Sequence, residues 1–347
     1  MGLFLLMFFI IYGAMHGYFL LRLRGALQLG PTATVVIALL LLLLVVTPLV
    51  IRLLDGWGHE VPARILAWGA DTWMGILFLF VTAGMLMELY RVTAFAAAFV
   101  LPLRPFMLRP TPAVLFLLPL IFALVAGSWG FWQALQIRST QVTIPVTTLP
   151  LGRDRLTIVQ ISDVHLGLLV REKRLAKILE QVRQASPDIL VVTGDLVDGQ
   201  IADMTGLAEP LRAIRPPFGK FAVIGNHEYY VGLDQALSFI DRCGFILLRD
   251  AWRQPLPGIA IAGVDDPAGR GFGRHSSPGE AELLSQLPAD AFRILLKHRP
   301  VVDAASAGHF DLQLSGHVHG GQIYPFTILT HLAYPVPNGL SHAEKGS

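Results

Sequence analysis

Four short polar motifs in the second half of the chain combine residue types that hold metal ions and transfer protons. In chain order they are Asp163-Val-His165, Gly194-Asp195-Leu-Val-Asp198, Gly225-Asn226-His227-Glu228 and Gly316-His317-Val-His319. One more histidine, His298, lies in the segment Lys297-His298-Arg299-Pro300. Aspartate, asparagine and histidine offer oxygen and imidazole ligands, which together suit Zn, Mn or Fe. The motifs therefore predict a metal site.

The chemistry that such a site supports is hydrolysis at phosphorus. One carboxylate can bridge two ions, and a pair of ions about 3.5–4 Å apart activates a water molecule and clamps the phosphoryl oxygens. Taken singly, the motifs are weak, because Asp-x-His pairs are common and Asp195 could be an ordinary helix N-cap. Five of the eleven histidines nevertheless fall within the set, and the set in its order is a strong indication.

Each motif follows a short apolar run that predicts a β-strand. The expected strands are residues 156–161, 189–193, 221–224, 245–248, 259–263, 293–296 and 311–314, and the expected helices are 172–184, 207–214, 233–243 and 278–287. This alternation is typical of an α/β domain, whose sites lie beyond the carboxyl ends of strands. In extended backbone, residues i and i+2 point to one side, so we expect Asp163 with His165, and His317 with His319, to face a common point.

Together the motifs resemble the signature of the calcineurin-like metallophosphoesterase superfamily, over about residues 155–325. The residues around Asp163 and His317 resemble those of its bacterial membrane-associated branch, which includes YkuE and YaeI. The resemblance implies an α/β/β/α sandwich, two divalent metal ions (Mn, Fe or Zn) and a bridging hydroxide as the nucleophile, without a covalent phosphoenzyme. It does not distinguish among the metals.

The resemblance also implies a role for each motif residue. The ligands of the first metal would be Asp163, His165 and His319, those of the second would be Asn226, His298 and His317, and Asp195 would bridge both. His227 would contact the phosphate and protonate the leaving oxygen. Asp198 would orient the ligands through hydrogen bonds.

Residues 1–150 have the composition of a membrane region. Of the 27 basic and 25 acidic residues, they hold 8 and 4, and the later residues hold 19 and 21. Three uncharged stretches, 3–21, 33–51 and 113–134, and a fourth at 65–87 interrupted only by Asp71, match the roughly 20 apolar residues that span a bilayer. A patch at 93–103 is too short to span alone. We therefore expect about four transmembrane helices within 1–137, a linker at 138–154 and the phosphoesterase domain at 155–347.

Charge and cysteine content exclude several classes of protein. A formal net charge of +2 gives no electrostatic reason to expect nucleic-acid binding. The single cysteine, Cys243, excludes an internal disulfide framework and a thiolate metal cluster. The sequence gives no indication of oligomeric state.

The sidedness of the soluble domain depends on a small difference in arginine count. Five arginines flank one side of the expected membrane helices and three flank the other, which favours an extracytoplasmic domain of a bacterial inner or plasma membrane protein. The five are Arg22, Arg24, Arg91, Arg104 and Arg109, and the three are Arg52, Arg64 and Arg138. Counting Arg153 and Arg155 makes the sides equal, so both orientations stay open.

The leading interpretation is a membrane-anchored dimetal phosphoesterase that cleaves a phosphomonoester, phosphodiester or pyrophosphate bond, with a phospholipid-like substrate as one candidate. The alternative is a metal-stabilised, non-catalytic binding module on a membrane sensor or transporter. Members of the YkuE- and YaeI-like branch usually continue with further strands beyond the region that corresponds to residues 335–339, whereas this sequence stops at Ser347. We therefore expect that edge strands of one sheet are missing from this sequence.

Overall fold

The chain divides into two compact units, Met1–Gln136 and Ile137–Ser347. The computed structural model describes residues 2–100, 110–146, 149, 152–199, 204–273, 279–322, 326–334 and 339–342. The linker expected at 138–154 is described only in part. The last residues of the expected phosphoesterase domain, 343–347, lie outside the described residues.

The first unit consists of helices, because its long apolar stretches satisfy their backbone hydrogen bonds internally only as helices in a bilayer. The described helices are α1 (Gly2–Leu27), α2 (Pro31–Gly56), α3 (Glu60–Val100) and α4 (Pro112–Ala134). All four are long and apolar enough to cross a membrane, as predicted. The patch at 93–103 does not form a separate helix up to Val100, because α3 runs through it, and residues 101–103 lie outside the described part.

Aromatic packing and one polar cluster hold this unit together. The rings of Phe19, Phe80 and Phe116 lie with centroids 5.0–5.6 Å apart. Glu88 on α3 pairs with Arg22 on α1 and, at 2.7 Å, with Arg91 one turn along α3. Apolar surface elsewhere on these helices is exposed, as a lipid-facing surface requires.

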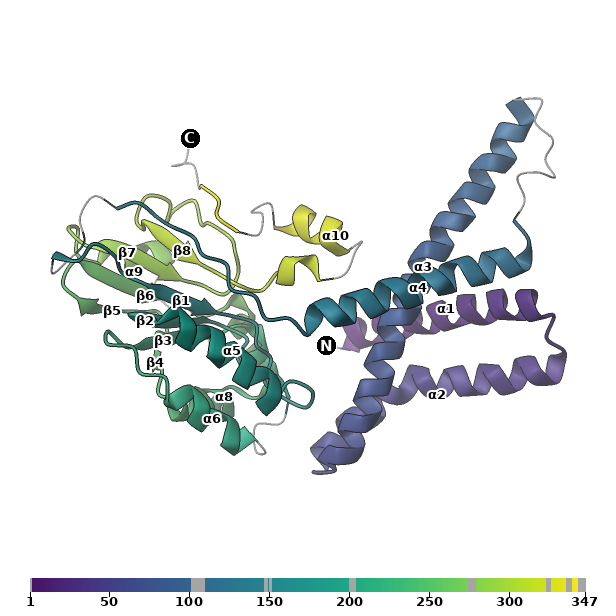
Figure 1. The fold of residues 1–347 in the computed structure, drawn as a ribbon, viewed down its shortest axis with the longest axis horizontal. Coiled ribbons are helices and arrows are strands. Elements are labelled where there is room, and N and C mark those ends of the chain that lie inside the picture. The colour runs from purple at the N-terminus through teal and green to yellow at the C-terminus, as the bar shows by residue number, and fades with distance from the viewer. Residues whose placement is uncertain are drawn as a thin grey trace. The chain divides into compact units, whose positions relative to one another are not determined.

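The second unit is a sandwich of two four-stranded sheets (Figure 1). The first sheet has the order β1 (Ile158–Ile161), β2 (Ile189–Thr193), β3 (Lys220–Val223), β4 (Ile246–Leu247), and all its pairs are parallel. The second has the order β5 (Ala251–Leu256), β6 (Ile259–Gly263), β7 (Phe292–Leu296), β8 (Leu312–Leu314), with only the β5–β6 pair antiparallel.

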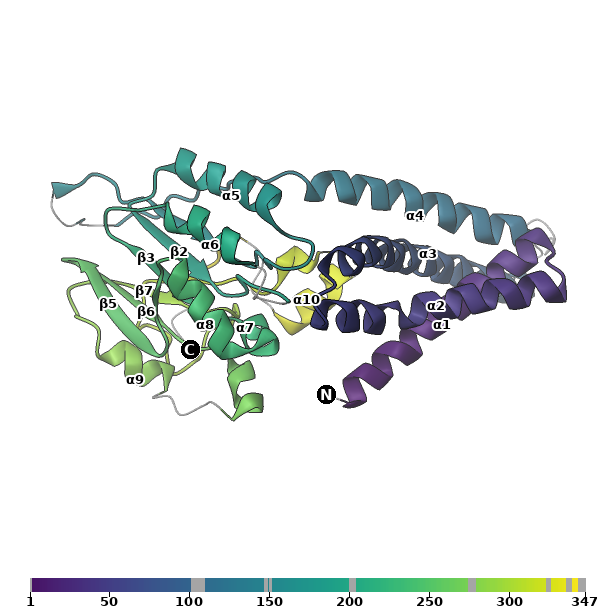
Figure 2. The same ribbon diagram turned by 90° about the horizontal axis from the view of Figure 1, so that it is seen from below.

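Helices cover the outer faces of both sheets (Figure 2), which confirms the α/β/β/α arrangement. Helices α5 (Glu172–Ala185), α6 (Thr205–Arg212) and α8 (Leu233–Arg242) pack on the first sheet, and α9 (Glu280–Ser285) packs on the second. The unit also contains α7 (Asn226–Val231), α10 (Phe326–Ala333) and the 3-10 turns η4 (Pro267–Phe272) and η5 (His319–Gly321). The residues of strand β2 are buried on both faces of the sheet, which explains its apolar run. Leu190 and Val192 pack toward α5, α6 and α8, and Ile189 and Val191 pack between the sheets.

One strand and two helices were not predicted from the sequence: β5, α7 and α10. Strand β5 was not predicted, because its central residues Arg253, Gln254 and Pro255 lack an apolar pattern; proline is tolerated there because β5 is an edge strand. Helix α7 was also not predicted, since six residues are too few for a helical period to appear. It begins at Asn226, so one of the polar motifs is a helix start rather than a loop.

Candidate dimetal centre

The predicted site residues lie where strands of both sheets end. Asp163 and His165 follow β1, Asp195 and Asp198 follow β2, and Asn226 and His227 open α7 after β3. From the second sheet, His298 follows β7, and His317 and His319 follow β8. Segments far apart in the chain thus meet at one end of the sandwich, as expected for an α/β fold.

One group of possible metal ligands consists of Asp163, His165 and His319. Each can offer one ligand atom, and these atoms lie within 4.8 Å of one another. His165 Nε2 lies 3.1 Å from His319 Nε2, and His319 Nε2 lies 3.3 Å from Asp163 Oδ1. The structure therefore gathers the three residues that the sequence assigns to one metal.

A second group consists of Asp195, His298 and His317, again with ligand atoms within 4.8 Å. His298 Nε2 lies 3.1 Å from both Asp195 Oδ2 and His317 Nδ1. The other ring nitrogen of His298, Nδ1, donates to the Thr193 carbonyl at 2.8 Å. This bond fixes the ring so that Nε2 points into the cluster.

Asp195 connects the two groups. Its Oδ2 lies 3.1 Å from His298 Nε2 and 3.9 Å from His165 Nε2. Its Oδ1 accepts the backbone N–H of His227 at 2.9 Å. A carboxylate in this position can contribute to both clusters.

The donor set fits metal ions. Two pairs of imidazole nitrogens face each other at 3.1 Å, an arrangement that uses their lone pairs well only when a proton or cation lies between them. Asn226 is buried, and its Oδ1 has no hydrogen-bond partner. Because buried polar atoms are normally paired, this free carbonyl oxygen is suited to a cation. Imidazole with carboxylate and amide oxygen suits Zn, Mn or Fe.

Comparisons with known proteins agree with this geometry. The family model described as calcineurin-like phosphoesterase matches residues 156–321. An uncharacterized metallophosphoesterase of Aquifex aeolicus (strain VF5) is 38% identical over 229 residues, which cover 65% of this chain and 87% of that protein.

The chain belongs to the calcineurin-like phosphoesterase family.

The matched region covers different shares of other relatives in the family. YkuE of Bacillus subtilis (strain 168) is 31% identical over 208 residues, covering 57% of this chain and 71% of YkuE. A Danio rerio protein named transmembrane protein with metallophosphoesterase domain is 32% identical over 236 residues, covering 64% of this chain but only 54% of its own. As a member of this family, the chain is a metal-dependent phosphoester hydrolase with a phosphoester substrate.

The backbone of this calcineurin-like site is not extended. The prediction that extended backbone directs residues i and i+2 to a common point is therefore wrong. Positive φ angles occur at Asp163 (53°), His165 (51°), Asp195 (51°), His317 (75°) and His319 (48°). Such left-handed conformations cost non-glycine residues roughly 1–3 kcal/mol each. The side chains therefore converge through tight left-handed turns that the surrounding hydrogen bonds must hold, and not through a β-pleat.

The protonation states of two ligands already favour metal binding. Burial opposes ionisation of Asp163, yet hydrogen bonds with His319 and Ser162 and the charge of His298 lower its pKa to about 2. Burial and the positive charges of His298 and Arg299 lower the pKa of His317 to about 4. At neutral pH the first is an anion and the second a neutral imidazole, which are the forms that bind metals.

His227 and Asp198 form a pair at the edge of the site. His227 Nδ1 lies 3.2 Å from Asp198 Oδ1. Burial disfavours the imidazolium, but Asp198 and Asp195 outweigh it and raise the pKa of His227. A raised pKa keeps a larger fraction protonated, as a proton donor requires. His227 also lies within ligand distance of His165 and Asp195, so distance alone does not separate donation from ligation.

Glu228 is a buried part of the site for which the motifs predict no role. Its fully buried carboxylate accepts four backbone N–H groups, from Gly225 (2.7 Å), Asp195 (3.0 Å), Leu196 (2.8 Å) and Val197 (3.3 Å). It thereby ties the turn that holds Asp195 to the start of α7. A glutamate three residues after the helix-capping position is the signal that could have found it.

Glycine at position 316 is required for space. A Cβ there would overlap Ser162 Oγ and Asp163 Oδ2. We expect Gly316→Ala to displace the Asp163 carboxylate and weaken Mn²⁺ affinity by about 10–100-fold, the range seen when ligand positioning is disturbed. Titration with Mn²⁺ measures this, and Gly206→Ala, where a Cβ meets nothing within 4 Å, is the control. Equal affinity in both variants would contradict the crowding argument.

Proposed function

We propose that this protein is a membrane-anchored phosphoesterase with two divalent metal ions, acting on an amphiphilic, lipid-linked phosphoester. The observation that carries the dimetal assignment is the position of Asp195, whose Oδ2 lies between His298 of one ligand group and His165 of the other. A phosphomonoester, a phosphodiester and a pyrophosphate remain as candidate bonds.

The residue roles follow the two clusters. Asp163, His165 and His319 hold one ion, Asn226, His298 and His317 hold the other, and Asp195 contributes to both. Divalent ions bound there supply an activated water and neutralise charge on the phosphoryl oxygens. Asp198 orients His227 and stabilises its protonated form.

His227 donates the proton that the leaving oxygen needs. It sits at the start of α7 with its backbone N–H fixed on Asp195 Oδ1, so its ring stays next to the clusters. Asp198, half exposed, raises the pKa of His227 and so favours its protonated form. A positioned acid of this kind typically contributes 10²–10⁴-fold to the rate.

The substrate class and location are inferred from the helical unit. Four candidate membrane spans precede the catalytic unit in one chain. They hold the catalytic unit at a bilayer, where lipid-linked phosphoesters have a high local concentration. Relatives in Bacillus subtilis and Aquifex aeolicus support a bacterial inner or plasma membrane, and the count of five arginines against three favours an extracytoplasmic catalytic unit.

Metal removal tests the proposal. We expect the detergent-purified full chain to hydrolyse bis-p-nitrophenyl phosphate, to lose activity on chelation and to regain it with Mn²⁺. His227→Ala should lower turnover by about 10²-fold with unchanged Mn²⁺ stoichiometry, whereas the exposed His309 provides the control His309→Ala.

The results separate the two roles of His227 and the two functions. A lower Mn²⁺ stoichiometry in His227→Ala would make His227 a ligand instead of the acid. A folded, metal-loaded protein that hydrolyses no phosphoester would contradict the proposed activity and favour a metal-stabilised binding module.

A further inference from the structure

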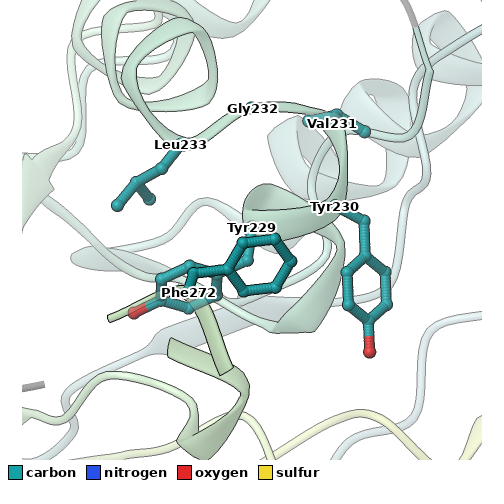
Figure 3. A pocket seen from close by; sticks show the side chains of 6 residues that line it. All are labelled: Tyr229, Tyr230, Val231, Gly232, Leu233 and Phe272. Carbon is teal, nitrogen blue, oxygen red and sulfur yellow. The ribbon is translucent and has the colours of Figure 1, made fainter. Parts of the chain in front are cut away.

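An aromatic cavity lies beside the proposed proton donor. It has a volume of about 410 Å³ and is lined by Tyr229, Tyr230, Val231, Gly232, Leu233 and Phe272. The lining comes from α7, Gly232, the first residue of α8 and the end of η4. Figure 3 shows the rings of Tyr229 and Phe272 close together, with the ring of Tyr230 to their right.

The cavity adjoins the leaving-group side of the site. The ring of Tyr230 packs edge-on against His227, with centroids 5.5 Å apart, and it lies 6.2 Å from Phe272. His227 is the group proposed to protonate the leaving oxygen. A substituent attached to that oxygen therefore lies close to the ring of Tyr230 in the cavity lining.

The lining is chemically suited to hydrocarbon. Among the residues that the structure describes, the lining contains no charged side chain, and its side-chain polar groups are the two tyrosine hydroxyls. Tyr229 donates its hydroxyl to Asp265 at 3.1 Å, which leaves its ring carbons for the cavity. Tyr230 and Phe272 are 58% and 51% exposed. Burying such exposed apolar surface against a hydrocarbon chain is favourable.

A second apolar surface borders the metal ligands. Tyr334, directly after α10, packs against His317 with ring centroids 5.4 Å apart. Helix α10 exposes Ile328, Leu329 and Leu332. Apolar side chains thus flank the clusters at α7 and at α10, in a chain whose own helices belong in a bilayer. Aliphatic chains are the apolar groups that such a protein meets at highest concentration.

We propose that the cavity between α7 and η4 binds the hydrocarbon chain of the substrate's leaving group, so that the enzyme prefers long-chain phosphoesters. This inference rests on the proposed phosphoesterase function. Tyr230 and Phe272 are then specificity residues that set the position of the chain relative to His227.

Alkylphosphonates provide the test, since they carry a chain on phosphorus and are not hydrolysed. Full-length protein in lipid nanodiscs with Mn²⁺ is titrated calorimetrically with ethylphosphonate, hexylphosphonate and phenylphosphonate, and each is also assayed as an inhibitor of bis-p-nitrophenyl phosphate hydrolysis. We expect hexylphosphonate to bind at least about tenfold more tightly than ethylphosphonate, a modest part of what four more buried methylenes could give.

Variants assign that preference to the cavity. Phe272→Ala and Tyr230→Ala should each reduce the hexyl-to-ethyl ratio by about threefold or more, and Tyr230→Phe, which keeps the ring, should retain it. Ile246→Ala, at a 44% exposed site on β4, is the control. Partition of hexylphosphonate into the lipid is the same for all variants and cancels in the comparison.

The outcomes are distinct. A hexyl-to-ethyl ratio near one, or one that neither alanine variant lowers, would overturn the proposal. A cavity-dependent gain for phenylphosphonate alone would replace the aliphatic chain by a planar ring. Binding is measured without turnover, so a protein that binds hexylphosphonate through these residues but hydrolyses nothing would contradict the phosphoesterase function and leave the cavity assignment standing.

Discussion

Asp195→Asn is expected to lower Mn²⁺-dependent hydrolysis of bis-p-nitrophenyl phosphate by about 10²–10³-fold. The replacement keeps the size of the side chain and the Oδ1 that accepts the His227 N–H, but it removes the negative charge and one of the two acceptor oxygens. That oxygen, Oδ2, lies near His298 and His165 at once. Losing several kcal/mol of stabilisation at the ions corresponds to a rate loss of this size.

The metal content of the variant makes the result specific. We expect Asp195→Asn to bind fewer than two Mn²⁺ ions per chain, measured by elemental analysis after dialysis. Asp290→Asn, at an exposed position, removes one carboxylate charge outside the site and controls for net charge. Full activity in Asp195→Asn would show that the two ligand groups do not share this carboxylate.

Glu228→Gln is expected to destabilise the catalytic unit by about 4 kcal/mol and lower its melting temperature by about 10 °C. In the native unit Oε2 accepts from Gly225 and Asp195, and Oε1 accepts from Leu196 and Val197. The amide of glutamine keeps one acceptor and puts a donor in place of the other. Two buried N–H groups then lose their partner, at about 1–3 kcal/mol each.

Calorimetry of the metal-free, detergent-purified chain measures this loss. Glu209→Gln on α6 is the control, because Glu209 is exposed and exposed substitutions usually change stability by less than about 0.5 kcal/mol. The Glu228 variant should also bind Mn²⁺ more weakly, since the turn that carries Asp195 is no longer held in its left-handed conformation. Unchanged melting would mean that the four N–H bonds contribute little to the fold.

Much of this fold was predictable from the sequence. Helix α2 and its neighbours follow from the lengths of their apolar stretches, and β2 and β6 were placed at their observed bounds. Both signals are local, because hydrophobic length and periodicity are properties of consecutive residues. The motifs were recognisable for a similar reason: Asp163, Asp195 and His317 each belong to a short pattern that stands directly after an apolar run.

The relative positions of those residues depend on the tertiary structure. Only the folded chain brings the backbone N–H of His317 to Asp163, 154 positions earlier, and only there does Asp195 lie between two ligand groups. The left-handed turns at the motifs and the burial of Glu228 depend on hydrogen bonds from other segments, which no local pattern encodes. Most helices and strands and the ligand types are thus predictable from the amino-acid sequence, because propensity and periodicity are local. The geometry of the site depends on tertiary contacts, because non-glycine left-handed backbone and buried carboxylates persist only where distant groups stabilise them.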